Sequence, residues 1–174
     1  MAIFHLDFKI VKRSEGMTSV AKAAYHARTR ITDDRIGETF DFSHRTDLHG
    51  HIILAPVSAP AHIVESCSAL WNEVERVERQ NNGQTARYFD VAIPVELSHD
   101  DKKKLVAEYC QKNFVDKGMI ADIAFHDLDG KNPHAHVMLT LKTIGPEGFG
   151  KKDRSWNDKK IMLQWRESWA TISN

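Results

Sequence analysis

Two segments with strand-like alternation flank a short loop rich in turn-forming residues, and this arrangement constrains the fold more than any other feature. The loop covers residues 127–133 (DLDGKNP) and joins the segment 119–126 to the segment 134–141. A loop of this length and composition is typical of a hairpin between antiparallel strands. Alternate side chains of a strand share one face, so Ile123 and Val137 are expected to face a core. The chain should therefore contain an antiparallel sheet.

The rest of the chain supplies further strands and helices in mixed order. Alternation of apolar and polar residues predicts strands over 3–11, 87–93 and 51–54. Helical spacing of apolar residues predicts helices over 19–30, 61–80, 98–117 and 158–172. We therefore expect an α+β fold, in which helices pack on one face of a mainly antiparallel central sheet and the other face is open. Residues 31–50 and 145–150 are expected to be irregular, and no linker divides residues 1–174 into several domains.

The composition argues against several classes of protein. No apolar run approaches the roughly 20 residues that a membrane-spanning helix requires. The first residues carry charges where a signal peptide would be apolar. The only two cysteines, Cys67 and Cys110, lie in helix-like segments, so we expect a cytoplasmic protein without membrane insertion or a disulfide framework. The formal net charge is zero and gives no argument for nucleic acid, although basic residues concentrate in 9–30 and 142–160.

Three histidines lie next to the loop of the expected hairpin. His134 and His136 are two residues apart in one strand, so their rings project from the same face. His126 can project from that face across the hairpin. Three neutral imidazoles with an open coordination position are typical of a catalytic metal site, and the alternative is three partly exposed histidines that bind nothing. An all-histidine set suits Mn, Ni, Co or Zn better than Mg, although availability in the cell favours Mg²⁺ or Mn²⁺.

Several motifs, in order along nearly the whole chain, carry a family resemblance. The segment NPHAHVM (132–138), with FHD (125–127) before it, resembles the metal-binding motif of the MobA/MobL (MobQ-type) plasmid relaxases, which are HUH endonucleases. Residues 1–28 (MAIFHLDFKIVKRSEGMTSVAKAAYHAR) resemble the first strand, the turn and the tyrosine-bearing helix of that family. Shorter matches are LWNEVE (70–75), AIPVEL (92–97) and QWRESW (164–169).

The resemblance implies a conjugative relaxase with the HUH fold, with Tyr25 as the nucleophile and His126, His134 and His136 as the ligands of a divalent metal ion. Such an enzyme nicks one DNA strand at a plasmid origin of transfer, keeps a 5′-phosphotyrosyl link and later rejoins the strand. The implied partners are single-stranded origin DNA, relaxosome accessory proteins and the coupling protein of a type IV secretion system, in a bacterial cytoplasm. Relatives commonly continue into a further C-terminal region, so residues 1–174 are expected to be the relaxase domain of a longer protein.

One strand position departs from the family pattern. Many relatives carry a glutamate on the active face where this chain has Tyr88, whereas the acid two residues later is present as Asp90. Asp90 is therefore the candidate for activating the tyrosine or orienting a histidine, and the role of Tyr88 stays open. The basic residues that we expect to contact DNA phosphates are Lys9, Lys12, Arg13, Lys22, Arg28, Lys151, Lys152 and Arg154.

Three alternative functions share some of these features. A rolling-circle replication initiator or a transposase of the HUH type would use the same chemistry, but these enzymes usually place the tyrosine helix after the histidines, whereas Tyr25 precedes them here. A metal-dependent hydrolase would activate water and leave Tyr25 a structural role. A single-stranded DNA-binding module without catalysis would keep the basic surface alone.

Overall fold

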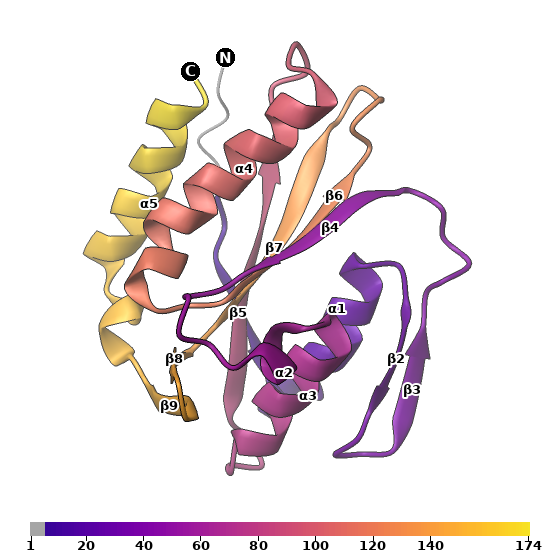
Figure 1. Ribbon diagram of the computed structural model, residues 1–174, viewed down its shortest axis with the longest axis vertical. Coiled ribbons are helices and arrows are strands. Elements are labelled where there is room, and N and C mark those ends of the chain that lie inside the picture. Colours follow the sequence, from indigo (N-terminus) through magenta and orange to yellow (C-terminus); the bar gives the residue numbers. More distant parts are fainter. Residues whose placement is uncertain (1–5) are drawn as a thin grey trace.

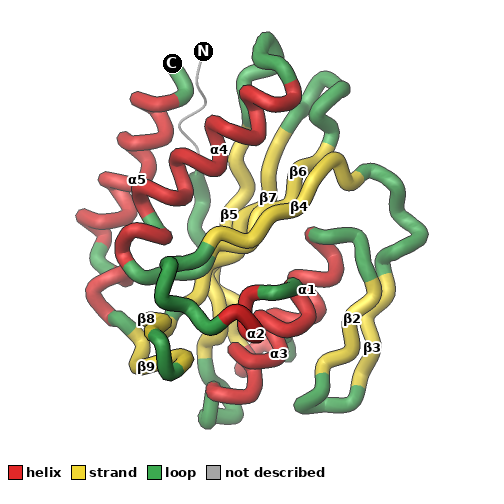
Figure 2. The backbone as a smooth tube through the Cα atoms, viewed as in Figure 1, coloured by secondary structure: helices red, strands yellow, loops and turns green. Residues whose placement is uncertain are grey.

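A five-stranded antiparallel sheet forms the centre of the molecule (Figures 1 and 2). The computed structural model describes residues 6–174. The strands stand in the order β1-β5-β7-β6-β4, and every neighbouring pair is antiparallel. Their bounds are β1 (Lys9–Lys12), β4 (Leu48–Leu54), β5 (Gln84–Ala92), β6 (Ala121–His126) and β7 (His134–Thr140). The expected α+β class with an antiparallel sheet is confirmed. The expected first strand begins later than predicted, and its residues 3–5 lie outside the described part of the chain.

The hairpin of β6 and β7 sets the register at the sheet centre. His126 pairs with His134, and Ala124 pairs with His136. Paired residues of neighbouring strands share one face, so the three histidines project from the same side. The loop between the strands begins at Asp127, which has a left-handed backbone with φ 54. Its carboxylate accepts a hydrogen bond from the Asn132 backbone N–H at 3.1 Å, which closes the loop.

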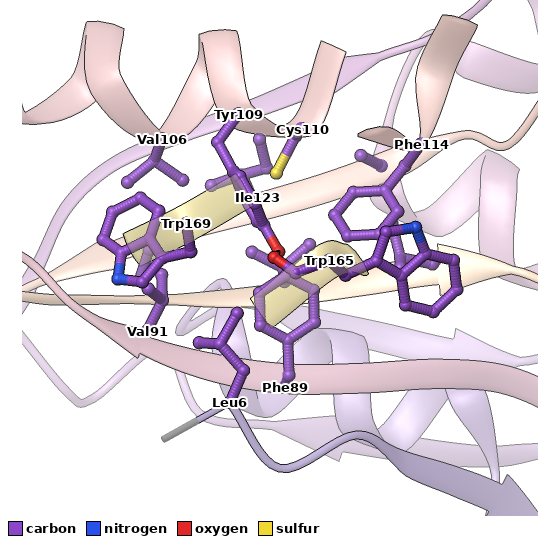
Figure 3. Packing of buried hydrophobic residues seen from close by; sticks show 14 of the residues in the cluster. Leu6, Phe89, Val91, Val106, Tyr109, Cys110, Phe114, Ile123, Trp165 and Trp169 are labelled. Atoms are coloured by element: carbon purple, nitrogen blue, oxygen red, sulfur yellow. Dashed lines mark hydrogen bonds between the residues drawn. The ribbon is translucent and has the colours of Figure 1, made fainter. Parts of the chain in front are cut away.

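One face of the sheet is covered by two long helices, α4 (His99–Asn113) and α5 (Lys159–Ile172). These helices lie side by side at the left of Figure 1. Figure 3 shows Tyr109 of α4 among Phe89 of the sheet and the two tryptophans of α5, and its hydroxyl donates a hydrogen bond to the Trp165 carbonyl at 2.8 Å. Trp165 and Trp169 are buried in this core. They are therefore packing residues of this core.

The opposite face carries His134, His136, Asp90 and Tyr88, and we call it the histidine face. Its other half is covered by α1 (Ser19–His26), α2 (Ala61–Val64) and α3 (Cys67–Val77), which pack over Ala86 and Met138. The expectation that helices cover only one face of the sheet was therefore incomplete. Apolar strand residues at positions 86 and 138 require cover, because exposed apolar surface is unfavourable. At the other end of this face, within the described residues, His134 and His136 are partly exposed.

Two small hairpins occupy regions that were expected to be irregular. They are formed by β2 (Arg30–Asp33) with β3 (Glu38–Asp41), and by β8 (Lys142–Gly145) with β9 (Gly148–Lys152). The single helix expected over 61–80 is divided, because the Ser66 hydroxyl caps a new helix by accepting from the Ala69 N–H at 3.0 Å. Short 3-10 helices cover Arg13–Glu15, Val115–Lys117 and Arg154–Asn157. Within residues 6–174, no helix is long and apolar enough to cross a membrane.

A buried ion pair joins the first helical segment to α3. Both Arg13 and Glu75 have side chains at most 4% exposed, and the Arg13 guanidinium donates to the Glu75 carboxylate at 2.7 Å. The Ser19 backbone N–H and hydroxyl donate to the other oxygen of Glu75. A buried charge needs partners of this kind, because desolvation is costly. The Arg13 guanidinium, which was predicted to contact DNA, is bonded inside the protein in this structure.

A second polar cluster lies under α3. His51 donates to one oxygen of the Asp122 carboxylate at 2.5 Å, and the Trp71 indole N–H donates to the other at 2.7 Å. Burial of His51 opposes the charged ring, but the hydrogen bond and the charge of Asp122 outweigh it and raise the pKa of His51. A raised pKa means that the pair contributes its full stability below the ordinary histidine pKa of about 6.5. That stability is lost as the pH rises through the raised pKa.

We expect His51→Gln to remove this pH dependence. At pH 6 the wild type should have a larger free energy of unfolding than the variant. This gap should be about 1 kcal/mol smaller at pH 8.5, which is the size of a partly exposed charge-assisted hydrogen bond. Urea denaturation at the two pH values measures the difference. His62→Gln serves as the control, because His62 is exposed. An equal gap between wild type and His51→Gln at both pH values would contradict the assignment.

Candidate functional site

Three histidines converge where the β6–β7 hairpin meets its loop. One ring nitrogen from each of His126, His134 and His136 lies within 4.8 Å of the others. The ring centroids of His126 and His134 are 5.4 Å apart, and those of His134 and His136 are 5.0 Å apart. The register described above produces this convergence. The arrangement agrees with the expected three-histidine set, although the binding of a metal there stays a prediction.

Hydrogen bonds fix the orientation of the two histidines on β7. The Nδ1–H of His134 donates to the Asn132 carbonyl at 2.7 Å, and the Nδ1–H of His136 donates to the Asp90 carboxylate. Each bond leaves the Nε2 lone pair of its ring free. Metal-binding histidines commonly donate their other N–H to a carbonyl or a carboxylate in this way, because the bond selects the tautomer and holds the ring. Both rings are therefore prepared to ligate through Nε2.

His126 differs from the other two because it is buried. Its Nε2–H donates to the His26 carbonyl at 2.7 Å, and its Nδ1 lies 3.4 Å from an Arg28 guanidinium nitrogen. Burial is the main cause that lowers the pKa of His126 to about 4, and the neighbouring His136 and Arg28 add to it. The ring is thus neutral at pH 7, and its remaining lone pair, on Nδ1, faces the Arg28 guanidinium. Three imidazoles form a donor set that fits Mn, Ni, Co or Zn.

Tyr25 lies in the last turn of α1, beside this cluster. Tyr25 is 37% exposed, more than the other two tyrosines. Its ring contacts that of Phe42 edge-on, with the ring centroids 5.3 Å apart. The following residue, His26, stacks its ring on His136 at 4.5 Å, and its carbonyl accepts the bond from His126. The end of α1 is therefore attached to the histidine cluster through both the ring and the backbone carbonyl of His26. This attachment brings Tyr25 to the site from a distant part of the chain.

The position that departs from the family pattern faces a lysine. The Lys22 ammonium lies 4.3 Å from the centroid of the Tyr88 ring. Burial is the main cause that lowers the pKa of Lys22, and Asp90 opposes it. Asp90 itself has its pKa lowered, because the hydrogen bond from His136 and the surrounding histidines together outweigh burial. Asp90 therefore remains a carboxylate that orients His136, which supports one of the two roles foreseen for it.

The remaining basic residues divide into three groups. Lys9 is exposed next to Tyr88 on β5, and Lys12 follows it towards the far end of β1. Arg28 is buried, with its donors engaged by protein atoms, so it is not a phosphate contact in this structure. The last group lies in the chain segment after β7, whose end is opposite to His134. It comprises Lys151, Lys152 and Arg154. Lys152 is paired there with Glu78 at 2.6 Å.

Sequence reasoning missed the two residues that connect Tyr25 with the cluster. His26 follows the tyrosine directly, but the role of its backbone carbonyl carries no sequence signal. Arg28 was grouped with the phosphate contacts because of its charge. Its carboxylate partner, Asp47, lies in a stretch that was expected to be irregular. A long-range pair of this kind cannot be found from spacing.

Replacing Asp90 with asparagine should weaken metal binding without unfolding the domain. Asparagine keeps the size but lacks the negative charge that strengthens the His136 bond, and it can present its amide N–H₂ to Nδ1. Changes to such outer partners typically reduce metal affinity about 10–100-fold. Titration with Mn²⁺ by calorimetry measures the loss. Glu96→Gln, which removes an exposed acid nearby in sequence, is the control and should bind as the wild type does. Unchanged affinity in Asp90→Asn would exclude the orienting role.

Comparison with known proteins identifies the family. The family model described as MobA/MobL family matches residues 17–174. The chain belongs to the MobA/MobL family. This result confirms the resemblance inferred from the motifs. The matched range includes Tyr25, Asp90 and the three histidines of the candidate site.

Named relatives of this MobA/MobL chain are conjugal transfer and mobilisation proteins. It is 35% identical to the conjugal transfer protein TraA of Agrobacterium fabrum over 87% of this chain and 14% of TraA. It is 30% identical to the mobilization protein MobL of Acidithiobacillus ferridurans over 87% of this chain and 46% of MobL. This MobA/MobL chain therefore spans well under half the length of TraA and slightly under half of MobL.

A solved structure shares the MobA/MobL fold seen here. It comes from work on the "Molecular Basis of Vancomycin Resistance Transfer in Staphylococcus aureus", with a TM-score of 0.90 and 29% sequence identity. The match covers 98% of this chain and 90% of that one. Close similarity over almost the full length of both chains confirms the fold class.

Proposed function

We propose that this MobA/MobL chain is a relaxase domain that nicks single-stranded DNA by a tyrosine transesterification. The observation that carries the proposal is the attachment of the Tyr25 helix to the three-histidine cluster through His26. An exposed phenol beside three converging imidazoles supports this chemistry, because it places a nucleophile next to residues that can hold a divalent ion. The proposal agrees with the conjugal transfer and mobilisation names of the relatives.

The reaction would be an exchange of one ester bond for another. The Tyr25 oxygen attacks the phosphorus of the scissile phosphodiester, and the bond from phosphorus to the 3′ oxygen breaks. The 5′ end stays attached to the tyrosine, and the released 3′ oxygen takes up a proton. Because the link is again a phosphodiester, the reverse reaction rejoins the strand. The phenol has an ordinary pKa of about 10, so attack at neutral pH needs a base or a nearby positive charge.

The described residues have distinct parts in this scheme. His126, His134 and His136 would hold a divalent ion, which when bound would polarise the scissile phosphate and offset its growing charge. Asp90 holds the ring of His136, and the His26 carbonyl holds that of His126. Lys22, on the helix turn before Tyr25, places a positive charge beside Tyr88 at the mouth of the site. A DNA phosphate entering there would meet this charge.

The substrate and partners proposed for the chain follow from the family. The DNA would be a single-stranded origin of transfer, and relaxosome accessory proteins and a type IV coupling protein would assemble around it. Mn²⁺ or Mg²⁺ would be the ion in the cell by availability, although the three imidazoles favour Mn, Ni, Co or Zn. Lys9 pairs with Tyr88 and Lys22 lies against the Tyr88 ring, so these two lysines are the proposed phosphate contacts at the histidine end. Lys12 pairs with Gln84 at the other end of β5 and would contact only a strand that extends there.

Incubation with candidate origin oligonucleotides tests the proposal. With Mn²⁺ present, a cleaved strand should migrate with the protein on a denaturing gel when the label is on the fragment 3′ of the nick, because the 5′ end of that fragment is joined to Tyr25. Release of both fragments free of protein would favour the hydrolase alternative. Tight binding without cleavage of any oligonucleotide would favour the binding module.

A further inference from the structure

Arg28 is a buried cation whose donors are engaged by protein atoms. Its side chain is 5% exposed. The Nε–H and one Nη2–H donate to the two carboxylate oxygens of Asp47 at 2.8 and 3.0 Å, and Nη1–H donates to the Tyr25 carbonyl at 2.7 Å. A bidentate bond of this kind fixes the guanidinium plane. The group is therefore held in place by the fold, and it would have to leave Asp47 before it could grip a phosphate.

The guanidinium held in this way faces two parts of the proposed active site. Its Cζ lies 4.6 Å from the centroid of the Tyr25 ring, within the range of a cation–π contact. Its Nη2 lies 3.4 Å from Nδ1 of His126. One rigid group thus contacts the backbone and the ring of Tyr25 together with a histidine of the cluster. Asp47, just before β4, anchors it from the opposite side.

The backbone of Arg28 is strained to reach this place. Its φ of 50 lies in the left-handed region, where side chains other than glycine are disfavoured. Such conformations are unfavourable and persist where the surroundings hold them. The three bonds of the guanidinium supply that hold. Glycine adopts this backbone without strain, so Arg28→Gly would remove the side chain while relieving the backbone.

We propose that Arg28 is a positioning residue, which locks the Tyr25 ring in line with the histidine cluster through its clamp on Asp47. The inference rests on the proposed function, because it assigns a task within the same nicking reaction. It adds that the orientation of the nucleophile depends on a side chain that does not touch the DNA. It also replaces the sequence-based prediction that Arg28 binds phosphate.

Fluorine NMR tests the lock without any reaction. The chain has only three tyrosines, so 3-fluorotyrosine gives three signals that Tyr25→Phe and Tyr88→Phe assign. We expect the Tyr25 signal to shift and change width in both Arg28→Gly and Asp47→Asn, because either variant breaks the clamp. Arg30→Ala is the control, since Arg30 is an exposed arginine on β2, two residues after Arg28, and its loss should leave the Tyr25 signal as in the wild type. A Tyr25 signal that is unchanged in both clamp variants would overturn the proposal.

Kinetics separate positioning from charge. Misplacing a reacting group by about 1 Å can cost 10²-fold in rate, so we expect kcat for adduct formation to fall roughly 10–100-fold in Arg28→Gly, with KM for the oligonucleotide little changed. Asp47→Asn should lower kcat in the same direction, although it keeps the Arg28 charge. A loss in Arg28→Gly alone, or a loss that appears in KM, would assign Arg28 to DNA binding and overturn positioning. If the wild type forms no adduct, the proposed function fails, while the NMR result still decides whether the clamp exists.

Discussion

Replacing Tyr25 with phenylalanine is expected to abolish the covalent protein–DNA product. Phenylalanine keeps the ring that packs against Phe42 and under Arg28, but it has no oxygen to attack phosphorus. Loss of an enzyme nucleophile lowers turnover by several orders of magnitude, on the order of 10⁴ or more. The measurement is a denaturing gel with a labelled origin oligonucleotide, alongside a binding assay, which should show that the variant still binds the DNA.

Tyr88→Phe is the matched control for this experiment. Tyr88 lies on the histidine face of the sheet, beside Lys22. The change also removes one phenolic hydroxyl, as Tyr25→Phe does. Adduct formation should persist in this variant, because its oxygen is assigned no part in the exchange. If Tyr88→Phe abolished the adduct and Tyr25→Phe did not, the nucleophile would lie on β5 and not on α1. Cleavage without an adduct in Tyr25→Phe would identify water as the attacking group.

Removing His136 is expected to eliminate both metal binding and nicking. The ring lies at the centre of the cluster, because it contacts His126 and His26, each at a centroid distance of 4.5 Å, and bonds to Asp90. Since the loss of an outer partner alone costs about 10–100-fold in affinity, His136→Ala should cost at least about 100-fold. Calorimetry with Mn²⁺ measures the affinity, and the adduct assay measures the rate.

A histidine outside the cluster controls for general effects on metal affinity. His44 is exposed, and His44→Ala should bind Mn²⁺ as the wild type does. A thermal melt of the metal-free proteins shows whether the His136→Ala domain is folded. Wild-type Mn²⁺ affinity in a folded His136→Ala domain would place the ion elsewhere or show that this cluster holds none.

The central hairpin was predictable because its signals are local. Strand alternation and a loop of turn formers fix the faces, and the two-residue spacing of His134 and His136 places both rings on one side. The faces of β5 followed in the same way, which put Asp90 and Tyr88 with the histidines. The family resemblance, confirmed by the family match, supplied the candidate Tyr25, which no periodic pattern identifies.

Other features depended on contacts between distant residues. The apolar spacing from Ile63 to Leu70 continues across the break at Ser66, so the sequence reads as one helix although a hydroxyl caps a second one. The strands of the β2–β3 hairpin are four residues long and mostly polar, which hides them among loops. Arg13 and Arg28 have the same charge as surface lysines. Only the fold shows that each meets a carboxylate 62 and 19 residues away, respectively.

The candidate site is assembled from two distant parts of the chain, which affects the order in which its parts form during folding. The three imidazoles come from eleven consecutive residues, 126–136, whereas the carbonyl that ties the tyrosine helix to them lies 100 residues away. Contacts between residues that are close in sequence form early, and contacts between distant residues form last, because closing a long loop costs more entropy. A nascent or partly opened chain could therefore capture an ion while its nucleophile is still elsewhere. Cutting activity would then begin only with the completed fold, which would spare DNA from damage by immature protein.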